Sequence, residues 1–155
     1  MIDRRAFLLL AAGALAAPAR AQLPPNIAAL RKAALEEAVH KATGGAPVRA
    51  GRVKLDLPPL IDNGNTVPLS VSVDSPMTEA DHVRSIHVFT EKNPQPSVLS
   101  AYLGPRAGRA AVSTRARIAD TGVVIAIAHM SDDSYWSDQV NVVVTLSACL
   151  EDGLI

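Results

Sequence analysis

The chain has 155 residues, which is enough for one domain, and 48% of them are apolar, so a buried core is expected. Its 15 basic and 15 acidic residues balance to a formal net charge of zero, and no basic excess points to a nucleic-acid partner. Aromatic residues make up only 3% of the chain, which further argues against a surface of interleaved basic and aromatic side chains for nucleic acid.

The first 21 residues have the features of an export signal. Arg4-Arg5 precede an apolar run over residues 7–17, and Ala19-Arg20-Ala21 offers a small-residue cleavage site before Gln22. The paired arginines indicate the twin-arginine route, which moves folded proteins. The run is too short to span a bilayer as a stable helix, and an N-terminal membrane anchor is the alternative. We therefore expect a periplasmic mature chain that begins at Gln22 and contains no membrane span.

Residues 22–47 are expected to form an N-terminal helix. Asn26 is a suitable N-cap, and Gly44-Gly45 followed by Pro47 ends the helix near Thr43. One set of apolar residues recurs with the helical period: Ile27, Leu30, Ala34, Ala38 and Val39.

Residues 48–146 show the pattern of a β-sandwich. About seven short segments are separated by turns rich in Pro, Gly, Asn and Asp, near residues 53–57, 67–73, 83–90, 98–103, 111–119, 123–128 and 139–146. The continuous apolar run over 123–128 is typical of a central strand, and Pro68 places the first part of its strand at a sheet edge. The sequence predicts a mainly β fold, an immunoglobulin-like sandwich of about seven strands preceded by one helix.

Cys149 is the only cysteine, so the chain can form no internal disulfide. In an exported protein an unpaired cysteine points to a reactive thiol or to an intermolecular bond. It lies in the C-terminal segment 147–155, beyond the last predicted strand, where we expect a mobile, accessible tail. A buried cysteine that packs as a small apolar residue is the alternative. Glu151 and Asp152 disfavour the thiolate, so the tail does not activate its own sulfur.

Other candidate sites are weaker. The four histidines (His40, His82, His87 and His129) lack the spacing of a zinc site, so we expect neither a metal nor a cofactor. Asp132-Asp133 is better explained as a polar turn than as a cation site. Trp136 fits a core position and an interface position equally well.

Several short motifs, taken in their order and spacing, resemble the SoxY family, the sulfur-carrier subunit of the thiosulfate-oxidising Sox system. The motifs are Thr43-Gly44-Gly45, Asn63-Gly64-Asn65-Thr66-Val67-Pro68, Val73-Asp74-Ser75-Pro76-Met77, Glu91-Lys92-Asn93-Pro94-x-Pro96, Val112-Ser113-Thr114-Arg115-x-Arg117 and Ser131-Asp132. This resemblance implies a β-sandwich carrier that is not itself an enzyme. It also implies a SoxZ-like partner subunit or a homo-oligomer, together with periplasmic enzymes that process the carried sulfur.

The resemblance places Cys149 at the family's carrier cysteine, which lies within a Gly-Gly-Cys-Gly-Gly arm. Here the flanking residues differ and are Ser147, Ala148, Leu150 and Glu151. The arm looks like that of SoxY-related variants with an Ala-Ala-Cys-Ile-Glu-like sequence. It is bulkier and stiffer than a glycine arm, because glycine has no side chain and tolerates more backbone angles. The alternative function is a non-catalytic binding or assembly module that has kept the fold and lost the arm's role.

Overall fold

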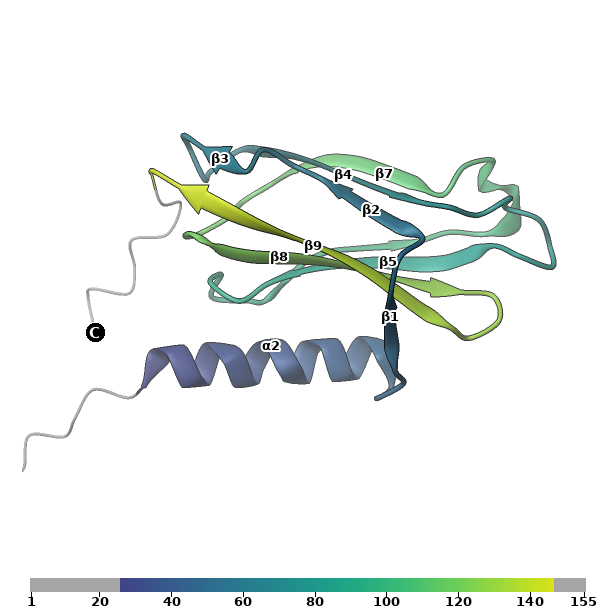
Figure 1. The fold of residues 1–155 in the computed structure, drawn as a ribbon, viewed down its shortest axis with the longest axis horizontal. Helices are drawn as coiled ribbons and strands as arrows, with labels where there is room; N and C mark the ends of the chain where they lie inside the picture. Colours follow the sequence, from purple (N-terminus) through teal and green to yellow (C-terminus); the bar gives the residue numbers. More distant parts are fainter. Residues whose placement is uncertain (1–25, 147–155) are drawn as a thin grey trace, which may run out of the picture.

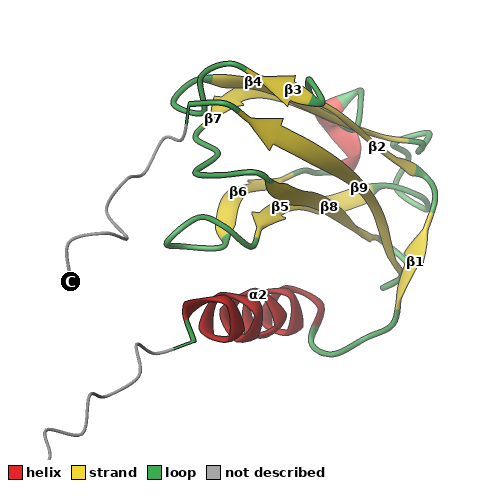
Figure 2. Ribbon diagram, turned by 60° about the vertical axis from the view of Figure 1, so that its left-hand side comes forward, coloured by secondary structure: helices red, strands yellow, loops and turns green. Residues whose placement is uncertain are grey.

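A computed structural model describes residues 26–146. Within this range the chain forms three layers, in which a small sheet packs on one face of a larger sheet and a helix lies across the opposite face (Figures 1 and 2). The helix is α2 (Ile27–Thr43), and everything after it is strand, turn or one short 3-10 turn (Pro105–Ala107). The predicted mainly β fold with an N-terminal helix is confirmed.

The described residues contain nine strands, which divide between the two sheets. Their bounds are β1 (Val48–Ala50), β2 (Val53–Asp56), β3 (Leu60–Ile61), β4 (Val67–Val73), β5 (Val83–Thr90), β6 (Ser97–Tyr102), β7 (Ala111–Ala116), β8 (Gly122–Met130) and β9 (Tyr135–Val144). The larger sheet has the order β1-β9-β8-β5-β6, with β3 also paired to β9, and the smaller sheet has the order β2-β4-β7.

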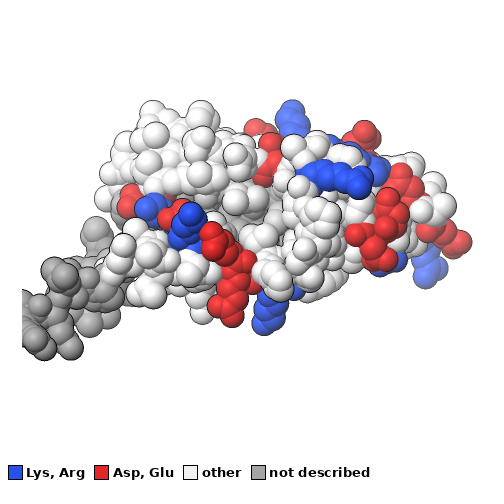
Figure 3. Space-filling model, turned by 60° about the horizontal axis from the view of Figure 1, so that its bottom comes forward, with Lys and Arg blue, Asp and Glu red and all other residues white. Residues whose placement is uncertain are grey.

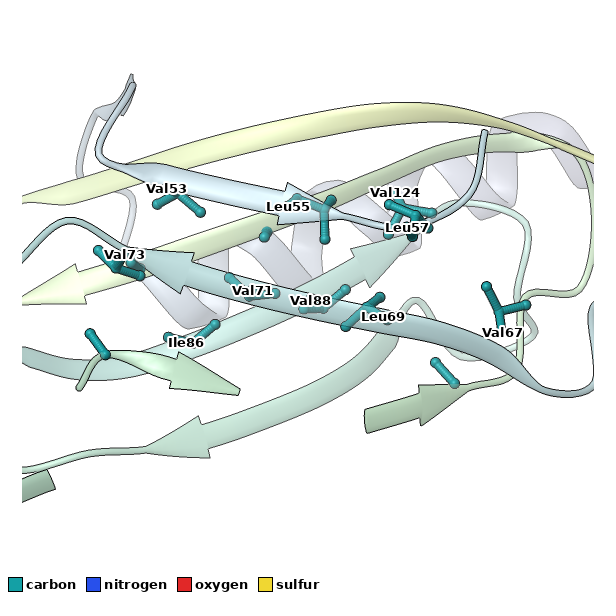
Figure 4. Packing of buried hydrophobic residues seen from close by; sticks show 14 of the residues in the cluster. Val53, Leu55, Leu57, Val67, Leu69, Val71, Val73, Ile86, Val88 and Val124 are labelled. Atoms are coloured by element: carbon teal, nitrogen blue, oxygen red, sulfur yellow. The ribbon is translucent and has the colours of Figure 1, made fainter. Parts of the chain in front are cut away.

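The core lies between the two sheets. Along β4, alternate residues from Val67 to Val73 are buried, and they face buried residues of β5 and β8 such as Ile86 and Val124 (Figure 4). Each fully buried aliphatic side chain contributes about 1.5–3 kcal/mol relative to an exposed one. This period-2 burial is the reason that the alternating sequence of β4 identified it as a half-buried strand.

The central strand β8 is buried on both faces. It is hydrogen-bonded to β5 on one side and to β9 on the other. Val124, Ala126 and Ala128 belong to the core between the sheets, whereas Ile127 is buried on the opposite face, outside that core. Ile125 lines a cavity together with residues of α2, so the helix covers this second face. The double burial explains the continuous apolar run and confirms the predicted central strand.

Helix α2 begins and ends where the sequence predicts. The side chain of Asn26 accepts a hydrogen bond from the N–H of Ala29 at 3.2 Å, and Gly44 adopts a left-handed conformation with φ of 61°. The predicted apolar face is only partly correct, because Ile27 and Leu30 are exposed and the half-buried residues come later in the helix. Among the described residues, no helix has the length and apolar character needed to cross a membrane.

Two short strands were not predicted. β1 and β3 have three and two residues, too few for an alternating pattern, and both run parallel to β9 at its two ends.

The prediction for Pro68 is confirmed: β4 is central in its sheet, but β2 pairs with it only from Ser70 onward. At Pro68 the only neighbouring strand is therefore β7, through Arg115, and the missing N–H of proline breaks no ladder bond on the open side.

Substitution of a core leucine and of an exposed leucine should have very different effects. Leu69→Ala should lower the free energy of unfolding by about 2–5 kcal/mol, because this side chain is fully buried between the sheets. Leu60→Ala, at an exposed position, should lower it by no more than about 0.5 kcal/mol. Urea denaturation followed by circular dichroism measures both values, and equal losses would contradict the assignment of the core.

Candidate functional site

The residues proposed from the sequence for the carrier arm lie outside the described residues. These are Cys149 and its neighbours Ser147, Ala148, Leu150 and Glu151. The structure describes the chain up to Leu146, and therefore shows the root of this segment, namely Thr145 and Leu146, which directly follow β9.

The root is fixed by the loop that follows β3. The N–H of Thr145 donates to the carbonyl of Ile61 at 2.9 Å, and its hydroxyl donates to the carbonyl of Asp62 at 3.0 Å. The N–H of Gly64 in turn donates to the carbonyl of Leu146 at 3.0 Å. Backbone hydrogen bonds therefore hold the chain up to three residues before Cys149.

Exposed apolar side chains surround the root. Leu60, Val143 and Leu146 are 59%, 51% and 55% exposed, and Leu60 and Val143 are direct partners in the pairing of β3 with β9. We call these three residues the root patch. Leu60 and Val143 are neighbours across the strand pair, and neighbouring exposed apolar residues are typical of a surface that contacts another protein.

A polar cluster lies on the face of the larger sheet that carries α2. His87 of β5 is half-buried there, and its ring makes hydrogen bonds with the hydroxyls of Ser100, at 2.9 Å from Nδ1, and of Ser85, at 3.0 Å from Nε2. Burial lowers the pKa of His87 below its ordinary value of 6.5, and the nearby His129 lowers this pKa further. His87 is therefore neutral at pH 7.

His129 belongs to an adjacent network at the end of β8. Its ring stacks on Tyr135 with centroids 4.4 Å apart, and its Nε2 lies 3.1 Å from the carboxylate of Asp133. Arg84 also pairs with Asp133 and donates to the carbonyl of Ser131 at 2.7 Å. These contacts tie the turn before β9 to β5.

The predicted polar turn at Asp132-Asp133 is confirmed. The carboxylate of Asp132 accepts hydrogen bonds from the hydroxyl and the N–H of Ser134, at 2.6 and 3.0 Å. These hydrogen bonds lower the pKa of Asp132, and the bond from the hydroxyl has the largest effect. Both aspartates thus serve to shape the turn through contacts within the protein.

Trp136 contacts the core, which is one of the two positions that the sequence left open. It is half-buried and packs against the core, while its Nε1 donates to the hydroxyl of Ser134 at 3.0 Å. The guanidinium groups of Arg49 and Arg52 lie 5.7 and 5.9 Å from the centroid of its ring. Such cation–π contacts add to the attachment of β1 at the sheet edge.

Histidine positions were only partly predictable. His82 precedes β5 and bonds to the carbonyl of Thr78 through Nδ1, so it is not part of the strand that contains His87. Sequence reasoning missed the cluster of His87, Ser85 and Ser100, because Ser100 reaches His87 only through the pairing of β5 with β6. Within residues 26–146, no three or more His, Cys, Asp or Glu side chains are grouped so that they could hold a metal ion.

The lowered pKa of His87 predicts a pH dependence of stability. Between the folded-state pKa and about 6.5, the unfolded chain binds a proton at this ring and the folded chain does not. The free energy of unfolding therefore falls as the pH decreases through this window. His87→Gln should remove this contribution, so urea denaturation at about pH 7.5 and about pH 5.5 should show a smaller loss for the variant than for the wild type. Identical losses would contradict this prediction.

Comparison with known proteins agrees with the motifs. Residues 39–149 match the family model described as sulfur oxidation protein SoxY, and this match ends on Cys149. No curated protein matches the sequence. Among solved structures, the fold is similar to that of the sulfur carrier protein SoxY from Chlorobium limicola f thiosulfatophilum. The TM-score is 0.63 with 24% identity, over 76% of this chain and 97% of that one.

Superoxide reductases share the fold at lower similarity. The neelaredoxin from Ignicoccus hospitalis has a TM-score of 0.54 and 19% identity, over 61% of this chain and 80% of that one. The superoxide reductase from Nanoarchaeum equitans has a TM-score of 0.52 and 10% identity, over 62% of this chain and all of that one. At such identities the likeness concerns the sandwich alone. The family match, in contrast, covers well over half of the sequence, and the chain belongs to the SoxY family of sulfur oxidation proteins.

Proposed function

We propose that this protein is a periplasmic carrier that holds sulfur intermediates covalently on Cys149 during the oxidation of thiosulfate-like compounds. The observation that carries the proposal is the SoxY family match, which extends to Cys149 itself. The fixed root supports it, because hydrogen bonds hold the domain together up to Leu146, three residues before Cys149 in the sequence. The carrier itself catalyses no step in this proposal.

The chemistry of the arm assigns the activation step to another protein. The thiolate is the nucleophilic form of cysteine, and the carboxylates of Glu151 and Asp152 oppose its formation. A processing enzyme with a basic site would neutralise these carboxylates and favour the thiolate when the arm enters. In this proposal, reaction at Cys149 is therefore coupled to docking with such an enzyme.

The root patch is the surface that we propose for a SoxZ-like partner subunit. Its three apolar residues would be buried by a neighbouring domain, which would leave the arm projecting from the edge of the contact. Burial of exposed apolar area is the main driving force for association, at about 25 cal/mol per Å². Charge at this patch should therefore weaken the complex while leaving the fold intact.

Intact-mass measurement of the protein recovered from the periplasm of cells grown on thiosulfate tests export and carriage together. We expect the mass of residues 22–155 plus that of a sulfur-containing adduct that a reductant removes. Cys149→Ser should keep the cleaved N-terminus and lose the adduct, and its stability should change by no more than about 0.5 kcal/mol if the residue is exposed.

Two results would contradict these proposals separately. A mass that includes Met1 would contradict export. If no adduct forms and the native thiol reacts with an alkylating reagent only after denaturation, Cys149 is a buried residue and the protein is better described as an assembly module.

The partner surface can be tested with two leucines of nearly equal exposure. Leu60→Asp, in the root patch, should reduce co-purification of a partner subunit at least about tenfold, because a charge would be buried without a counterion. Leu30→Asp, on α2 and 60% exposed, is the matched control and should leave co-purification unchanged. Equal effects of the two variants, or none from Leu60→Asp, would place the partner elsewhere.

A further inference from the structure

A groove of about 470 Å³ lies on the face of the larger sheet that carries α2. It is lined by residues of the helix and of the edge strand β6, and also by His87 and Phe89 of β5. The turn that contains Gln95 and Pro96 also contributes to its lining, and Tyr102 of β6 is 79% exposed beside it. This volume is within the range of small-molecule sites, about 300–1,000 Å³. Figure 3 views this face, where charged side chains of both signs are separated by large uncharged areas.

The burial of Ser85 indicates which atom donates in each hydrogen bond of His87. Ser85 is only 4% exposed, and the Nε2 atom of His87 is the acceptor within reach of its hydroxyl. A buried hydroxyl hydrogen without an acceptor is costly, so the hydroxyl of Ser85 donates to Nε2. The neutral ring then carries its hydrogen on Nδ1 and donates it to the hydroxyl oxygen of Ser100.

This orientation leaves the hydrogen of the Ser100 hydroxyl free. Ser100 lines the groove and is exposed, and its oxygen is already occupied as an acceptor from His87. Its hydroxyl can therefore donate to a bound molecule. The lowered pKa of His87 keeps the ring neutral, which preserves this direction of donation at pH 7. The chain of bonds from Ser85 through His87 thus presents a polarised donor at the groove wall.

Charge in the lining has a single sign. Lys41 of α2 lines the groove, and within the described part of the chain it forms no ion pair with a carboxylate. No Asp or Glu lines the groove, and the remaining lining is largely apolar, with Ala38, Ala42 and Pro96 among its residues. This lining suits a molecule with an anionic acceptor for Lys41 and Ser100 and an apolar body for the rest.

We propose that this groove binds a small organic anion, a carboxylate with an aromatic or aliphatic body. The carboxylate accepts hydrogen bonds from the ammonium group of Lys41 and from the hydroxyl of Ser100, and the body packs beside Pro96 and the ring of Tyr102. The site uses neither Cys149 nor the root patch, so it adds a binding function that is independent of the proposed sulfur carriage.

Phenylacetate and phenylacetamide test the proposal, because they have nearly the same shape and differ in charge. In ¹H–¹⁵N correlation spectra of the ¹⁵N-labelled chain with reductant present, phenylacetate should shift the amide signals of residues 38–43 and 97–102 in a saturable manner. Phenylacetamide should bind at least about threefold more weakly, because it forms no ion pair with Lys41. Ser100→Ala should weaken phenylacetate about tenfold through loss of a charge-assisted hydrogen bond.

Two lysines on the same helix provide the control. Lys41→Gln should reduce the affinity for phenylacetate to that for phenylacetamide, whereas Lys32→Gln, outside the groove, should leave it unchanged. Equal binding of the two probes, equal effects of the two lysine variants, or shifts spread over the whole surface would each overturn the proposal. Because none of these measurements depends on Cys149, their outcome is separate from that of the carrier proposal.

Discussion

The pairing of β9 on both of its sides is the constraint on which the position of the root depends. β8 pairs with β9 from Tyr135 to Val142, and β1 and β3 pair with its opposite side at the two ends. Between these ends, the carboxylate of Asp138 accepts a hydrogen bond from the N–H of Leu55 at 2.8 Å, which joins β9 to the smaller sheet. A strand held in this way cannot slip without breaking bonds to four strands, so its last residues have a fixed position relative to the core.

The fixed root bears on the replacement of glycine by other residues in the proposed arm. In a flexible arm, the reach of the sulfur is set mainly by glycine joints. Here only Ser147 and Ala148 separate Leu146 from Cys149 in the sequence, and both carry a side chain. A partner enzyme would then have to accept side chains where the family's arm has glycine.

Short-range sequence patterns predicted the elements that depend on local burial and capping. The features that depend on strand pairing could not be predicted in this way. The alternation in β4, the apolar run of β8 and the caps of α2 each indicated an element that the structure contains, because burial on one face, burial on two faces and capping each leave a short-range pattern. β1 and β3 left no such pattern, since their pairing depends on β9. Cys149 was identifiable as the single cysteine, whereas the contact of His87 with Ser100 required the register of β5 and β6.

The pairing of early strands with the last strand also has a consequence for the order of folding. Leu55 and Asp138 are 83 residues apart, so this side of the sheet closes only after nearly the whole chain has been made. Contacts of such large sequence separation slow folding, because the entropy of loop closure is lost before they form. A newly synthesised chain therefore has its thiol before it has a root to direct it. Export after folding, as proposed from the paired arginines, would deliver the thiol to the oxidising compartment only after the root of its segment has formed.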